Sequence, residues 1–194
     1  SRTQPSYEQI DVDYNNDQPL VTGLSVFQLD ATTGRTLWHR ERGVLLNTSL
    51  TLSGNRLFLV ESRNPELLRH PTGRIPLTRF LEREPWLVAL DARTGELVWE
   101  KPIQGALARS RNVLYLASSS DKLVVLGSHL DPANDTRYSV ETLSTADGSL
   151  LWTADHLARV PGEFTHGEQV HHPVILADYL VAEPAVYELG TGKR

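Results

Sequence analysis

The chain has 194 residues, of which 40% are hydrophobic and 22% are charged, an ordinary composition for a globular protein with its own core. The net charge of -5 lacks the basic excess of nucleic-acid-binding surfaces, so we expect no nucleic-acid partner. The absence of cysteine excludes disulfides, thiolate metal sites and cysteine nucleophiles, and no apolar run is long enough to predict a membrane span.

A repeated segment organises residues 21–194, and residues 1–20 precede it as an N-terminal extension. Copies of the segment occupy residues 26–38, 88–99 and 140–152, and a further copy begins at residue 186. The distances between successive copies are similar to or longer than the roughly 40 to 50 residues of a four-stranded propeller blade. The repeat therefore predicts a propeller with insertions in its earlier copies.

Each copy predicts a β-hairpin with a tight turn. Asp30 and Asp91 begin their turns, where a carboxylate can accept a hydrogen bond from the backbone two residues on. Gly34 and Gly95 supply the positive φ that such a turn requires. In the third copy the acidic residue has moved next to Gly148.

Tryptophan ends the second strand of the first three hairpins, at Trp38, Trp99 and Trp152. A large flat side chain at one equivalent position is suited to packing one blade on the next, because blade sheets are buried on both faces. The fourth copy reaches its turn glycine, Gly192, and the sequence ends two residues later, before the expected tryptophan strand.

Short strands are predicted between the hairpins, each next to a turn signal. They cover residues 56–60, 113–117, 122–126, 174–176 and 179–182. Strands this short and this evenly spaced indicate an all-β fold of antiparallel blades.

Residues 87–99 resemble the repeat of the quinoprotein-type (PQQ-like) propeller family. This repeat occurs in PQQ-dependent alcohol dehydrogenases and also in the propeller lipoprotein of the outer-membrane β-barrel assembly machinery, which binds no quinone. The resemblance extends from about residue 20 to the end of the chain. It implies a structural role for the repeat positions, namely Asp30, Gly34, Trp38, Asp91, Gly95, Trp99, Gly148, Trp152 and Gly192.

The resemblance also implies rings of seven or eight blades, of which about four are present here. We therefore expect an incomplete ring, whose further blades come from the rest of a longer chain or from another chain. An unpaired strand edge after Gly192 would invite pairing with more polypeptide.

A group of histidines and glutamates precedes the last repeat, at Glu163, His166, Glu168, His171 and His172. Imidazole and carboxylate together suit zinc or iron, which makes the group a weak candidate metal site. The alternative is a polar loop, because the group has no known ligand spacing and adjacent histidines point to opposite faces of an extended segment.

An insertion at residues 62–85 accounts for the longest spacing between repeats and is rich in arginine and glutamate. Residues 77–81 within it are predicted to form a helical turn. Propeller function usually resides in loops on a face of the ring, so the insertion is a candidate protein-binding surface. The alternative, which we favour, is a solvated excursion without a partner.

The leading functional hypothesis is a non-catalytic scaffold that binds a protein or ligand through its face loops. The family implies an exported bacterial protein, in the periplasm or outside the cell. The alternative is a segment of a PQQ-dependent dehydrogenase, and PQQ with calcium is implied only under that alternative. No residue of this chain aligns with the family's calcium ligands, base or cysteine pair, so no catalytic residue is predicted.

Overall fold

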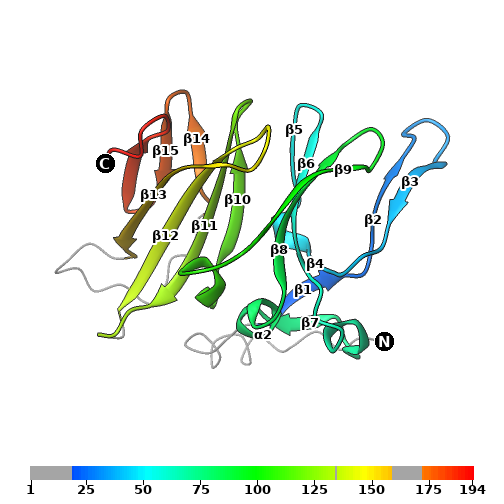
Figure 1. Ribbon diagram of the computed structural model, residues 1–194, viewed down its shortest axis with the longest axis horizontal. Coiled ribbons are helices and arrows are strands. Elements are labelled where there is room, and N and C mark those ends of the chain that lie inside the picture. The colour runs from blue at the N-terminus through cyan, green and yellow to red at the C-terminus, as the bar shows by residue number, and fades with distance from the viewer. Residues whose placement is uncertain (1–18, 134, 159–171) are drawn as a thin grey trace.

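The computed structural model describes residues 19–133, 135–158 and 172–194. Four β units follow one another along this part of the chain, as the colour sequence of Figure 1 shows. We call them units A to D. They form an open arc with units A and D at its two ends, which confirms the predicted all-β, partial propeller.

Unit A is a two-stranded hairpin of β2 (Val26–Leu29) and β3 (Thr36–Arg40). Unit C is a four-stranded antiparallel blade in the order β10-β11-β12-β13. Its strands are β10 (Leu114–Ser118), β11 (Lys122–Leu130), β12 (Thr136–Ser144) and β13 (Leu150–Leu157). Unit D has three strands, β14 (Val174–Leu176), β15 (Tyr179–Ala182) and β16 (Ala185–Glu188).

Unit B belongs to a larger sheet because two additional strands extend it. Its own strands are β4 (Val44–Leu46), β5 (Thr51–Ser53), β6 (Arg56–Ser62), β8 (Pro85–Asp91) and β9 (Leu97–Pro102). A 3-10 turn, η1 (Asn47–Ser49), separates β4 from β5, and both of these strands pair with β6. The extra strands are β1 (Pro19–Gly23), which pairs with β4, and β7 (Arg74–Pro76), which pairs with β1.

The little helix that the described residues contain lies beside units B and C. It comprises η2 (Leu67–Arg69), α2 (Leu77–Leu81) and η3 (Leu107–Arg109). The position of α2 confirms the helical turn predicted for residues 77–81. Within the described ranges, no helix is long and apolar enough to span a bilayer.

The core is divided into clusters that coincide with the contacts between units. Val26 of unit A shares one cluster with Val88 and Leu90 of unit B. Trp99 of unit B shares the largest with Leu143 of unit C, and the cluster around Tyr187 joins unit C to unit D. Strand β11 is buried on both faces along most of its length, as expected for a sheet between two others. Packing between units therefore contributes to each of these clusters.

Candidate functional site

Each hairpin turn begins with a polar residue whose side chain accepts hydrogen bonds from the turn. Asp30 Oδ1 accepts the amides of Thr32 and Thr33, and hydrogen bonds from Thr33 lower the pKa of Asp30. Asp91 Oδ1 accepts the amides two and three residues on. Ser144 takes this position in unit C, where its hydroxyl accepts the amide of Ala146. The displaced Asp147 instead accepts the amide and hydroxyl of Ser149.

The indoles of the repeat connect each unit to the next. Trp38 Nε1 donates to the carbonyl oxygen of Ala92 at 3.0 Å. The corresponding bonds run from Trp99 to Thr145 at 3.0 Å and from Trp152 to Leu189 at 2.9 Å. In every case the acceptor is the second residue of the following hairpin's turn. The tryptophans are therefore equivalent in contact as well as in sequence position.

The turn glycines lie directly under these indoles. A Cβ atom added to Gly95 would come within 2.7 Å of the Trp38 ring, and one on Gly148 within 2.8 Å of the Trp99 ring. Gly192 would meet Trp152 at 2.6 Å. These glycines also have φ between +71° and +73°, a backbone conformation that is unfavourable for residues other than glycine. Both the backbone and the close indole contact thus require glycine.

We call this arrangement a docking socket, defined by the residue before the turn, the carbonyl of the second turn residue and the turn glycine. Unit B contributes Leu90, Ala92 and Gly95 to its socket. The sockets of units C and D are Leu143, Thr145 and Gly148, and Tyr187, Leu189 and Gly192, respectively.

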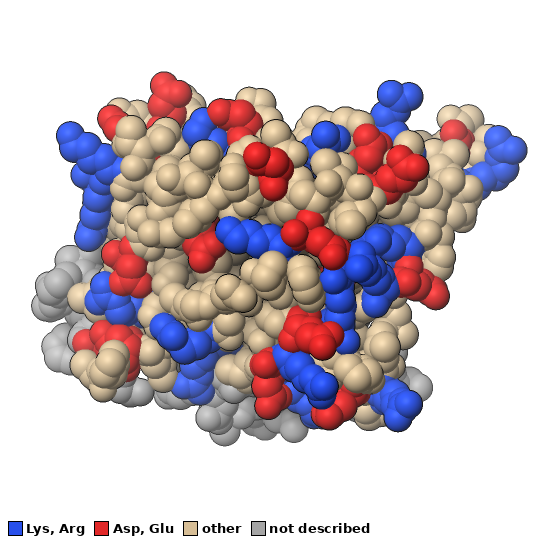
Figure 2. All heavy atoms as spheres, viewed as in Figure 1, with Lys and Arg blue, Asp and Glu red and all other residues tan. Residues whose placement is uncertain are grey.

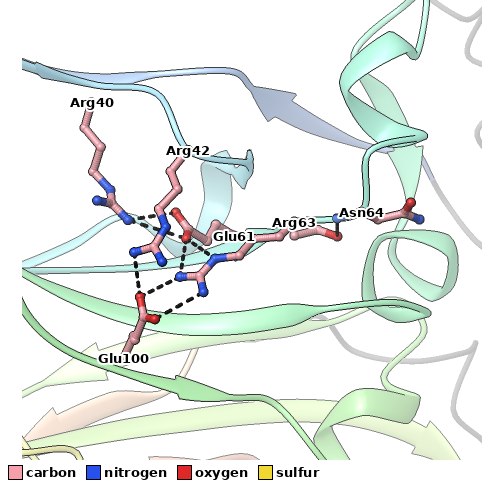
Figure 3. A network of polar contacts seen from close by, with 7 residues as sticks. Arg40, Arg42, Glu61, Arg63, Asn64 and Glu100 are labelled. Carbon is pink, nitrogen blue, oxygen red and sulfur yellow. Dashed lines mark hydrogen bonds and ion pairs between the residues drawn. The ribbon is translucent and has the colours of Figure 1, made fainter.

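An ionic network joins the end of unit A to unit B (Figure 3). Glu61 is completely buried at the end of β6 and contacts Arg40 at 3.3 Å and Arg63 at 2.8 Å. Arg63 also forms a two-pronged contact with Glu100, at 2.6 Å and 3.2 Å. Arg42 reaches the same Glu100 carboxylate at 2.9 Å.

The guanidinium groups of Arg40 and Arg63 compensate the negative charge of the buried Glu61 carboxylate. The hydrogen bond from Arg63 lowers the pKa of Glu100, so Glu100 stays ionised at neutral pH. The Arg63 guanidinium also lies 4.3 Å from the ring centroid of Trp86, within the range of a cation–π contact. The network is a structural clamp, since its charged groups are engaged with one another.

The insertion at residues 62–85 is closed at its base and packed against the protein. The Ser62 hydroxyl donates to the Arg83 carbonyl, and the Arg63 amide donates to the Glu84 carbonyl at 3.0 Å. Apolar side chains of the insertion join the largest core cluster: Leu67, Ile75, Leu77, Phe80 and Leu81. The expectation of a solvated excursion is wrong, because these side chains anchor the segment in the core.

The outer side of the insertion presents exposed charges of both signs and an exposed Leu68. The exposed charged residues are Glu66, Arg69, Arg79, Glu82, Arg83 and Glu84. In Figure 2, basic and acidic side chains alternate over the lower right of the view, where Figure 1 shows the insertion. A fixed segment with an exposed mixed-charge surface is suited to contact another protein.

A groove lies beside the insertion, at the end of unit C. It is lined by η3 and the β11–β12 connection, including Arg109, His129, Asp131, Arg137 and Asp155. Asp155 pairs with Arg137, whereas no ion pair joins Arg109 to another described residue. Because α2 contacts η3, the insertion is next to the element that forms one wall of the groove, and we call the insertion and the groove together the loop face.

The buried Ser139 contacts two residues of the groove lining, His129 and Asp155, but the order of the three does not suit nucleophilic catalysis. The Ser139 hydroxyl lies between the other two, at 3.2 Å from Asp155 and 3.4 Å from His129 Nδ1. A nucleophile of this type needs histidine between serine and the carboxylate. The contacts therefore fix the groove wall.

Most of the candidate metal group lies outside the described residues, namely Glu163, His166, Glu168 and His171. His172 is described, and its ring packs 4.8 Å from that of Tyr115, with Nδ1 3.1 Å from the Pro173 oxygen. Among the described residues, histidines and carboxylates form no group of three placed to bind a metal. The metal site stays a prediction.

Residues 23–184 match the family model described as outer membrane protein assembly factor BamB. This chain belongs to that family. The predicted resemblance to PQQ-like propeller repeats is thereby confirmed. No curated protein matches the chain significantly.

The fold is similar to that of a solved BamB structure. BamB from Moraxella catarrhalis aligns with a TM-score of 0.50 at 20% identity, over 88% of this chain and 45% of that chain. A europium-containing methanol dehydrogenase aligns with a TM-score of 0.46 at 16% identity, over 75% of this chain and 24% of that one. This chain thus spans less than half the length of either structure.

Sequence reasoning missed the ionic network and the groove. Arg40, Glu61 and Glu100 are far apart in the sequence and resemble ordinary surface charges. One signal was available for Glu61, which follows the apolar run of β6 directly and so falls at the end of a buried strand.

Proposed function

We propose that this chain is a non-catalytic propeller scaffold that binds a protein partner through its loop face. The observation that carries the proposal is the packing of the insertion: a segment anchored by five buried apolar side chains holds its charged outer surface in place. Preorganised surfaces bind with less loss of conformational entropy than mobile loops do. The family's description as an assembly factor for outer membrane proteins supports an interaction role.

The proposal includes a location outside the cytoplasm, in the periplasm or beyond it. The family description places BamB with outer membrane protein assembly, and this supports an exported bacterial protein. We further propose that the partner contributes acidic side chains, because the Arg109 guanidinium lines the groove without an ion pair to a described residue.

The test compares two triple charge reversals. The first changes the exposed insertion residues Arg69, Arg79 and Arg83 to glutamate. The control changes Arg35, Arg93 and Lys193, which are exposed on the hairpin turns away from the insertion. Each triple alters the net charge by the same amount, so a general electrostatic effect would be common to both.

The measurement is quantitative affinity purification from the envelope of the native host after mild crosslinking. We expect a partner that the wild type and the control triple retain equally and that the insertion triple loses by at least about tenfold. Equal retention by all three proteins would contradict a role for the insertion. If only the control triple lost the partner, the binding surface would instead lie on the side of the hairpin turns.

A further inference from the structure

The groove beside the insertion lies where the connection from unit B to unit C crosses strand β11. Gly127 and His129 are two residues apart on this strand, so their side-chain positions lie on the same face of it. The segment of η3 packs on that face, because a Cβ added to Gly127 would overlap the Ser110 hydroxyl and come within 3.1 Å of Leu107. His129 therefore lies beside η3, which carries Arg109, and both residues line the groove.

His129 presents one free ring nitrogen to the groove. The residue is only 8% exposed, and its Nδ1 lies 3.4 Å from the Ser139 hydroxyl. Because a carboxylate only accepts, this hydroxyl donates to Asp155 and accepts from Nδ1–H, which leaves a lone pair on Nε2 of the neutral ring. Nε2 has no hydrogen-bond partner among the described residues and is not sealed from solvent, so a ligand N–H can reach it from the groove.

The charges of the groove lining balance one another, and among the described lining residues one cation is left for a ligand. Arg137 is engaged with Asp155 and lies 4.0 Å from Asp131. Arg109 is exposed, and its guanidinium makes no ion pair with a described residue. A single carboxylate can therefore pair with Arg109, whereas a run of acidic residues would also be repelled by Asp131 and Asp155.

The rest of the groove lining is apolar and accessible. It consists of Ala106, Leu130 and Pro132, of which Leu130 and Pro132 are exposed. The groove has a volume of about 660 Å³, which is in the range of sites for small ligands and short peptide segments. An apolar wall, one cation and one hydrogen-bond acceptor match a peptide segment with one carboxylate, backbone N–H groups and apolar neighbours.

We propose that the groove binds one acidic side chain of the partner, presented between apolar residues on an extended segment. Its carboxylate pairs with Arg109, and a neighbouring backbone N–H donates to His129 Nε2. The flanking apolar side chains lie on Leu130 and Pro132. This inference rests on the proposed function, because it specifies the chemistry by which the loop face recognises its partner.

The test uses the full chain and three pentapeptides that are acetylated and amidated at their ends. The first peptide has a central aspartate between two leucines, with alanine at both ends. The second has asparagine in place of the aspartate, and the third has aspartate in place of both alanines. On the chain, Arg109→Gln removes the free cation. Arg35→Gln is the matched control, because Arg35 is also an exposed arginine but lies on the hairpin turn of unit A.

Binding is followed by NMR titration of the isotope-labelled chain at physiological ionic strength, after circular dichroism has shown that both variants fold. For the first peptide we expect saturable shifts of the Arg109 Nε–H and of the His129 ring. Binding should be at least about tenfold weaker for the asparagine peptide and for Arg109→Gln. The peptide with three aspartates should bind more weakly than the first peptide, and Arg35→Gln should bind like the wild type.

Three results would overturn the proposal. They are equal binding by the asparagine peptide, tightest binding by the peptide with three aspartates, and no saturable shift of the groove residues at about 10 mM of the first peptide. If one of these occurs while the insertion triple still loses its partner, the proposed function stands and only this inference fails. If the insertion triple keeps its partner while the first peptide binds in the groove, the insertion has no role and the groove site stands.

Discussion

The turn of unit A and the socket of unit C have the same local design and different surroundings. In unit C, Trp99 covers Gly148 and Leu143 is buried, whereas in unit A no described residue lies over Gly34 and Leu29 is exposed. The turns themselves match, with φ of +73° and +70° at their glycines. The comparison shows that the turn has the same geometry with or without a covering unit, whereas the burial of the leucine before it depends on the neighbouring unit.

The largest expected contrast is between leucines at the same repeat position. Leu90→Ala removes a fully buried side chain and should lower the free energy of unfolding by about 2–5 kcal/mol. Leu29→Ala removes a half-exposed one and should cost less than about 1 kcal/mol. Urea denaturation of both variants measures the contrast, and equal losses would mean that unit A is covered in the isolated chain.

The turn glycines of units A and C should give the next largest difference in stability when each is replaced by alanine. Gly148→Ala combines a disfavoured backbone conformation, at about 1–2 kcal/mol, with a clash against Trp99, at about 1–3 kcal/mol. Gly34→Ala has the backbone cost alone, because no residue in the described part of the chain lies within 4 Å of its added Cβ. The thermal midpoint of Gly148→Ala should therefore be lower, and similar midpoints would show that the indole does not rest on Gly148.

The ionic network should have a smaller effect that depends on pH. Glu100→Gln weakens the contact with Arg63 and should cost about 1–2 kcal/mol at pH 7. Glu41→Gln is the control, since the Glu41 side chain is 66% exposed. Because Arg63 lowers the folded-state pKa of Glu100, the stabilisation is complete above the ordinary glutamate pKa and is lost as pH falls through the lowered value. A variant whose deficit persists unchanged at acid pH would contradict this assignment.

The smallest expected effect concerns His156, at the contact between units C and D. Burial lowers the pKa of His156, whose Nδ1 lies 2.8 Å from the Tyr187 hydroxyl. The folded state thus favours the neutral ring, so stability is complete above the ordinary histidine pKa and falls as pH drops below it. His156→Gln should show a smaller loss of thermal midpoint between pH 7.5 and pH 5.5 than the wild type. An equal loss would assign the pH dependence to other groups.

Local sequence signals were sufficient for the hairpins and for the helical turn at residues 77–81. A turn residue such as Asp30 and a positive-φ glycine act within a few residues, so their effect can be read directly. The burial of the insertion was not predictable in this way, because Leu67 and Phe80 have no regular spacing and reach the core through the closure of a long loop.

The ionic network and the groove depend on contacts between distant segments. Glu61 is buried because unit A covers it and Arg40 compensates its charge, and neither condition is local. The turn of unit A is a related case: the repeat identifies Gly34, but only the structure shows that no described residue lies over this glycine.

The central claim is that the repeat tryptophans join successive units by hydrogen bonds to the turns. Hydrogen exchange of the indole Nε1–H groups, assigned by single Trp→Phe variants and followed by NMR, tests it most directly. We predict slow exchange for Trp38, Trp99 and Trp152, with Trp99 among the most protected because it is 9% exposed. Exchange of these groups at the rate of a solvent-exposed indole would contradict the account.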